Sequence, residues 1–80
     1  MNKMVLSAIV RKISKKYGVQ DYYVITRLEK DKYEVRTELP SYDGGAELKI
    51  AVENTFPDFI CENQGGCVYI IYKPITAIKY

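Results

Sequence analysis

The chain of 80 residues contains no histidine and no tryptophan, and it has only two cysteines. Without histidine, neither a serine–histidine nor a cysteine–histidine nucleophile pair can form. Two cysteines alone cannot complete a structural zinc site within one chain. No apolar run approaches the roughly 20 residues that a membrane helix needs. These absences exclude the commonest hydrolase, zinc-binding and membrane-spanning classes.

Motifs for catalysis or cofactor binding are also missing. No spaced pair of carboxylates indicates glycosidase chemistry. The segment Asp43-Gly44-Gly45 lacks the spacing of a Walker or dinucleotide-binding motif. We therefore predict a non-enzymatic protein with no cofactor, no metal and no membrane contact. An enzyme that uses tyrosine, carboxylate or lysine side chains at a dimer interface is the alternative.

The N-terminal residues do not form a secretory signal, because Arg11 and Lys12 interrupt the apolar segment and no small-residue cleavage site follows. We therefore predict an intracellular, cytoplasmic location. Tyrosine is frequent, at 8 of 80 residues. In its richness in tyrosine, isoleucine and lysine, the composition resembles small proteins of thermophilic archaea and their viruses.

Charge is distributed unevenly along the chain. The first 17 residues carry five basic residues and no acidic one, a charge of +5, and the rest carries seven basic and ten acidic residues, a charge of −3. Such asymmetry favours an anionic partner. The candidate phosphate-binding residues, which would contact DNA or RNA irrespective of base sequence, are Arg11, Lys12, Lys15 and Lys16.

Two helices are predicted. Residues 3–17 repeat apolar side chains at three- and four-residue spacing, from Val5 to Tyr17, which is typical of an amphipathic helix. A second helix begins at a cap formed by Ser41 or Asp43 and runs to about Thr55.

Two hairpins are predicted, one after each helix. In residues 22–29 and 32–39, pairing Leu28 with Tyr33 gathers the apolar side chains on one face and sets Arg27 against Glu34. The second hairpin joins residues 59–62 and 67–73 through a turn at 63–66. Its last strand is apolar on both faces, from Val68 to Tyr72, which indicates a central position in the sheet.

The order helix, hairpin, helix, hairpin predicts a single α+β domain over residues 1–80, with αββαββ topology. We expect a four-stranded, mainly antiparallel sheet with both helices on one face. This order resembles a ferredoxin-like domain whose first strand has moved to the C-terminus, a resemblance of topology that implies no activity. Residues 75–80 are either an extra edge strand or a frayed end.

The two cysteines allow two registers of the second hairpin. Pairing Cys61 with Cys67 would permit a disulfide bond. Pairing Cys61 with Val68 sorts the charged residues outward and leaves two free thiols, and this register is preferred.

Under the preferred register, one sheet face is uncovered and partly apolar. Its candidate interface residues are Tyr23, Ile25, Ile60, Tyr69 and Ile71. Exposed patches of this kind mark interaction sites. We therefore predict a small binding protein that forms a homodimer through this face and contacts nucleic acid through the basic helix. The alternative is an inhibitor or adaptor, of the type found in viruses and mobile elements, that binds a host protein through the same face.

Overall fold

The computed structural model describes residues 1–19 and 23–74. A helix α1 (Lys3–Lys16) is followed by the hairpin β1 (Tyr23–Glu29) and β2 (Lys32–Thr37). A tight turn η1 (Ser41–Gly45) leads into α2 (Ala46–Thr55), and the hairpin β3 (Ile60–Gly65) and β4 (Val68–Tyr72) completes the order. The predicted α+β class and αββαββ order are confirmed.

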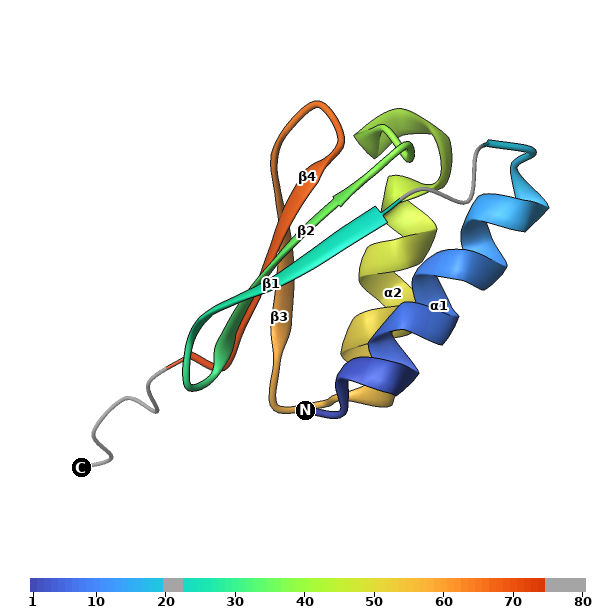
Figure 1. Cartoon of the computed structure of the whole chain (residues 1–80). Helices are drawn as coiled ribbons and strands as arrows, with labels where there is room; N and C mark the ends of the chain where they lie inside the picture. Colours follow the sequence, from blue (N-terminus) through green and yellow to red (C-terminus); the bar gives the residue numbers. More distant parts are fainter. Residues whose placement is uncertain (20–22, 75–80) are drawn as a thin grey trace.

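The four strands form one antiparallel sheet in the order β1-β2-β4-β3. Both helices lie on the same side of the sheet, and no helix of residues 1–19 or 23–74 covers the opposite face (Figure 1). β4 is a central strand beside β2, as its two-sided apolar pattern predicted, and the strand order is that of the permuted ferredoxin-like arrangement. The predicted alternatives for residues 75–80 lie outside the described residues.

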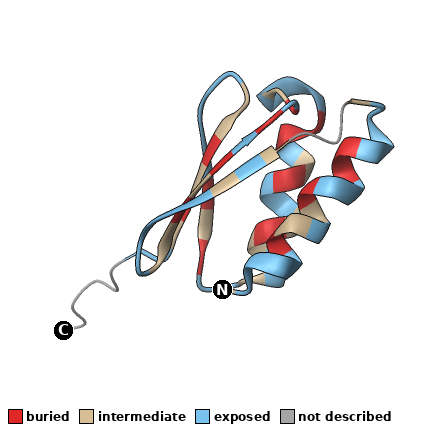
Figure 2. Cartoon of the chain, in the orientation of Figure 1, coloured by how far each residue is buried: buried red, intermediate tan, exposed pale blue. Residues whose placement is uncertain are grey.

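The core lies between the sheet and the two helices (Figure 2). Asn2 caps α1, because its side chain accepts hydrogen bonds from the N–H groups of Met4 and Val5. Of the predicted α1 stripe, Val5 and Tyr17 are more than a third exposed, and in the last turn Ser14 is buried beside Ile13. The fully buried apolar residues are Leu6, Val10, Val35, Leu39, Leu48, Val52, Cys61 and Ile71.

The predicted register of the first hairpin is wrong over most of its length. Glu29 does pair with Lys32, but a bulge between Arg27 and Glu29 shifts every earlier pair by one residue, so Ile25 lies opposite Val35. A one-residue shift exchanges the two faces of a strand. Tyr23 and Ile25 therefore pack against the core, and the predicted pairing of Arg27 with Glu34 does not form. Residue 22, where the first predicted strand begins, lies outside the described residues.

The predicted register of the second hairpin is also wrong. Cys61 lies opposite Ile71 rather than Val68, a shift of three residues. The turn is tighter than expected: Gly65 pairs with Val68, so the loop consists of Gly66 and Cys67, and Gly66 has a φ of 57°, which suits a two-residue hairpin turn. A bulge between Asn63 and Gly65 then sets the register of the rest of β3. An odd shift again exchanges the faces, and it moves Tyr69 and Ile71 to the helix side.

Candidate interaction surfaces

The open face of the sheet is the side that no helix covers. Because side chains alternate along each strand, the observed registers place three β4 residues, Val68, Ile70 and Tyr72, along the middle of this face. Each of the three is partly exposed. Their neighbours on the strands beside β4 are Lys32, Glu34, Arg36, Ile60 and Glu62. Val24 and Thr26 of β1 continue the face on the far side of β2.

Four of the five predicted interface residues do not lie on the open face. Tyr69 and Ile71 are 1% and 0% exposed and belong to the core, so their predicted outward orientation is wrong. Tyr23 and Ile25 are partly buried against the same core. Ile60 alone lies on the open face, opposite Tyr72. The sequence pattern located the uncovered face, but the two register errors assigned most of its residues wrongly.

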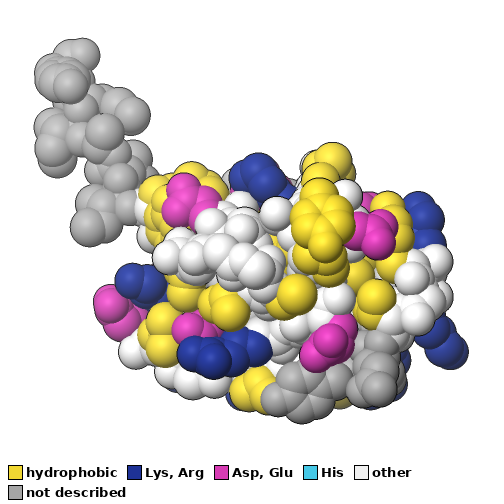
Figure 3. Space-filling model, turned by 90° about the horizontal axis from the view of Figure 1, so that it is seen from above, with side chains coloured by type: hydrophobic (Ala, Val, Ile, Leu, Met, Phe, Trp, Pro, Cys, Tyr) yellow, Lys and Arg dark blue, Asp and Glu magenta, His cyan; other side chains and the backbone are white. Residues whose placement is uncertain are grey.

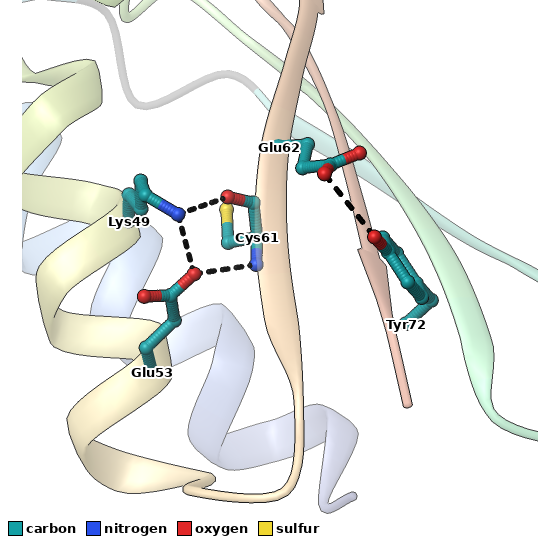
Figure 4. A network of polar contacts seen from close by, with 5 residues as sticks. All are labelled: Lys49, Glu53, Cys61, Glu62 and Tyr72. Atoms are coloured by element: carbon teal, nitrogen blue, oxygen red, sulfur yellow. Dashed lines mark hydrogen bonds and ion pairs between the residues drawn. The ribbon is translucent and has the colours of Figure 1, made fainter. Parts of the chain in front are cut away.

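The open face carries charges of both signs at short range. Arg36 Nε lies 3.0 Å from Glu34 Oε1, on the same strand. The hydroxyl of Tyr72 donates to Glu62 Oε2 at 3.1 Å, across β4 and β3 (Figure 4). This hydrogen bond to Glu62 raises the pKa of Tyr72, because ionisation of the hydroxyl would remove the donated proton and place two negative charges together. The face is therefore mainly apolar along β4, and β2 and β3 carry its charged side chains.

A groove of about 800 Å³ is hollowed into one end of this face, beside the β1–β2 turn. Leu28, Ile70, Tyr72 and Pro74 supply its apolar lining, and Lys32 lies among them. The other lining residues are Glu29, Lys30, Asp31, Glu62, Gln64 and Lys73. A concave region lined by both apolar and polar side chains is the form expected of a binding surface.

The predicted phosphate-binding residues lie together on α1, where Lys16 contacts α2. Lys16 Nζ lies 2.8 Å from Glu47 Oε2 on α2, and the hydroxyl of Tyr17 donates to Glu47 Oε1 at 2.9 Å. These contacts lower the pKa of Glu47 and raise that of Lys16. Arg11, Lys12 and Lys15 are exposed. Elsewhere, the surface in Figure 3 shows basic and acidic side chains interspersed rather than one region of a single sign.

The outer edge of β3 is occupied by two side chains of α2. Cys61 N–H donates to Glu53 Oε2 at 3.0 Å, and Cys61 C=O accepts from Lys49 Nζ at 3.0 Å. Lys49 and Glu53 are themselves 2.6 Å apart, one helical turn from each other (Figure 4). The pair binds the backbone of Cys61 as a neighbouring strand would. The four-residue spacing of Lys49 and Glu53 indicates an ion pair on a helix. It does not indicate that the pair binds the backbone of Cys61.

The two cysteines are free thiols: Cys61 is fully buried and Cys67 is half-buried. Burial raises the pKa of the Cys61 thiol to about 12. Over residues 1–19 and 23–74, no group of three or more cysteine, aspartate or glutamate side chains could hold a metal ion. No helix in these ranges is long and apolar enough to cross a membrane.

Comparisons with protein-family models, with curated proteins and with solved structures found no match to this chain. What the protein binds is therefore inferred from the surfaces of the molecule itself.

Proposed function

We propose that the protein is a small, non-enzymatic binding protein that forms a homodimer through the open face of its sheet. One observation carries the proposal: the central strand β4 turns Val68, Ile70 and Tyr72 toward a face that no element of the described chain covers. Apolar residues in the middle of a sheet face favour association, because contact with a partner removes them from water.

The charges on the face support a second copy as the partner. A two-fold interface brings the same surface of each subunit together. Lys32 and Arg36 lie on this face with Glu34 and Glu62, so each subunit offers both members of an intersubunit ion pair. A face of one sign would instead repel its own copy. The proposal places the dimer in the cytoplasm, where thiols such as Cys61 and Cys67 stay reduced.

Sedimentation velocity over a range of protein concentrations tests the homodimer. We expect Ile70→Glu to weaken the dimer by roughly a hundredfold or more, because a buried, unpaired carboxylate costs several kcal/mol. Ile50→Glu is the matched control, since Ile50 is 59% exposed on α2, away from the open face. A dimer that survives Ile70→Glu, or a wild-type protein that is monomeric at every concentration, contradicts the proposal. A monomeric protein would favour the alternative hypothesis, in which the open face of an inhibitor or adaptor binds a host protein.

A second candidate function is contact between α1 and the phosphates of DNA or RNA. The supporting observation is that Arg11, Lys12 and Lys15 extend along the exposed side of α1. Binding of this kind weakens steeply as salt rises, because it releases counterions. We expect the double variant Arg11→Glu/Lys15→Glu to abolish it and Lys73→Glu, outside α1, to leave it nearly unchanged. Wild-type protein that shows no salt-dependent binding to either nucleic acid excludes this function.

A further inference from the structure

The outer backbone groups of β1 can be identified from the hydrogen bonds of β2. Thr37 N–H donates to Cys67 C=O, and Lys73 N–H donates to Asp31 C=O. The odd-numbered residues of β2 therefore direct their backbone groups toward β4, since the direction alternates along a strand. Their β1 partners must point the other way. Tyr23, opposite Thr37, and Ile25, opposite Val35, thus direct their N–H and C=O groups to the outer edge of the sheet.

The two edges of the sheet differ in how their outward backbone groups are bound. On β3, the outward N–H and C=O of Cys61 are bound by Glu53 and Lys49. On β1, no side chain of the described residues binds the outward groups of Tyr23 or Ile25. The guanidinium of Arg27 donates only to the carbonyls of Glu29 and Lys30, at the turn. Unpaired backbone groups on an edge strand are a template for another strand.

The side chains at this edge are also incompletely covered. Tyr23 and Ile25 pack against the core on the helix side but stay partly exposed. Val24, on the open face, is 41% exposed. A fifth strand beside β1 would cover all three, because its side chains would alternate between the same two faces.

We propose that the β1 edge binds an extended, acidic segment of a partner protein by strand addition. In this mode, main-chain hydrogen bonds provide affinity and side chains provide selectivity. Selectivity for an acidic segment comes from Arg27, which is exposed at the end of the open stretch and has no carboxylate partner within residues 1–19 and 23–74. A second copy of β1 fits less well, because residues 23–28 would bring another Arg27 and no acid.

Strand addition goes beyond the proposed homodimer and uses a different part of the sheet. The dimer would cover the open face, whereas the added strand lies in the plane of the sheet beside β1. The two interactions can therefore be separated by single substitutions at Ile70 and Ile25.

The experiment uses the full chain and a short capped peptide that alternates valine with threonine and carries one glutamate. Binding is followed by the amide NMR signals of the protein. We expect saturable shifts at Tyr23, Ile25 and Arg27, and slower hydrogen exchange at the amide of Ile25. A peptide with lysine in place of the glutamate should bind about two- to fivefold more weakly, the size of an exposed ion pair.

Two variants at one position isolate the backbone contribution. Ile25→Pro removes the outward N–H without breaking a β1–β2 hydrogen bond, so the sheet tolerates it, and we expect it to abolish peptide binding. Ile25→Ala loses the same side chain but keeps the N–H, and it should still bind. If Ile25→Pro does not fold, Tyr23→Pro with Tyr23→Ala repeats the comparison at the start of the strand.

Opposite results overturn the inference. Peptide binding that persists in the proline variant, shifts confined to the open face, or equal affinity for the lysine peptide would each do so. Self-pairing of β1 would appear as dimerisation that Ile25→Pro abolishes and Ile70→Glu does not. In that case the β1 edge would bind a second copy of this chain and not an acidic segment, which overturns the inference. Loss of dimerisation only in Ile70→Glu would support the proposed homodimer through the open face. The peptide results would then decide strand addition separately.

Discussion

The hydroxyl of Tyr69 donates a hydrogen bond of 2.5 Å to the carbonyl oxygen of Leu39, inside the core. This bond joins the central strand β4 to the segment that leaves β2. Tyr69 is 1% exposed, and burial raises its pKa to about 12. The same hydroxyl lies against Gly45, at the start of α2. One buried side chain therefore fixes how the second helix enters the core.

Tyr69→Phe should destabilise the protein by about 1–3 kcal/mol, because the carbonyl of Leu39 is left buried without a partner. The free energy of unfolding in urea measures the loss. Tyr42→Phe is the matched control, since Tyr42 is 89% exposed and should change stability little. Equal effects of the two substitutions would show that the Tyr69 bond is not stabilising.

Gly45→Ala should destabilise the protein by about 1–3 kcal/mol through overpacking. An added Cβ would collide with the Tyr69 hydroxyl and lie 2.8 Å from the carbonyl oxygen of Pro40. Gly18→Ala, where no atom lies within 4 Å of the Cβ position but φ is 69°, should cost stability through backbone strain alone, whichever residue occupies position 69. Combining Gly45→Ala with Tyr69→Phe should cost less than the sum of the two, because Phe removes the nearest atom. Simple additivity in this cycle would contradict the predicted collision.

Glu53 should make stability depend on pH in the acid range. Its hydrogen bond from Cys61 N–H, and then that from Lys49, hold the pKa of the Glu53 carboxyl below the usual 4.5. The stabilisation is therefore present above pH 4.5 and lost as pH falls through the lowered pKa. We expect Glu53→Gln to cost about 0.5–1 kcal/mol at neutral pH and to flatten the acid slope. Glu38→Gln, at an exposed position outside this network, should leave the acid slope of stability unchanged. The free energy of unfolding at several pH values measures these slopes, and the same slope in wild type and Glu53→Gln would contradict the assignment.

The two thiols should differ sharply in reactivity. The pKa of Cys61 is raised from 9.0 to about 12, which lowers its thiolate fraction near neutral pH by roughly a thousandfold. Burial also blocks access to its sulfur. An aromatic disulfide reagent should therefore modify one thiol quickly, and Cys67→Ser should remove that fast phase. Fast labelling that persists in Cys67→Ser would show that Cys61 opens readily to solvent.

Much of the fold was predictable because it depends on local patterns. The apolar spacing of residues 3–17 located α1, and the β-branched run from Val68 to Tyr72 indicated a central strand. Pro40 and Pro57 lie on either side of η1 and α2, where the chain passes to the flanking strands. The basic residues of α1 were correctly placed on one exposed helix, but the contact between Lys16 and Glu47 joins residues 31 positions apart, and no local pattern reports it.

The open face was less predictable than the elements that build it. β4 has apolar side chains on both sides, so either orientation of the strand buries apolar residues against the helices. The hydrophobic pattern alone therefore does not show whether Tyr69 or Ile70 faces the core. The choice depends on register, and register depends on the turn. The bulge near Leu28 moved β1 by one residue, and the tight turn at Gly66-Cys67 together with the bulge between Asn63 and Gly65 moved β3 by three.

By itself, the sequence determined which segments become helices and strands, their order, and the concentration of positive charge on α1, since these follow from residue type and spacing along the chain. Only the tertiary structure decided which side of each strand meets the helices and which edge of the sheet is closed. Both depend on contacts between distant residues: Tyr69 fits beneath the turn at Gly45, and the pair Lys49–Glu53 reaches the backbone of Cys61. The open face and the β1 edge are what these contacts leave available for binding.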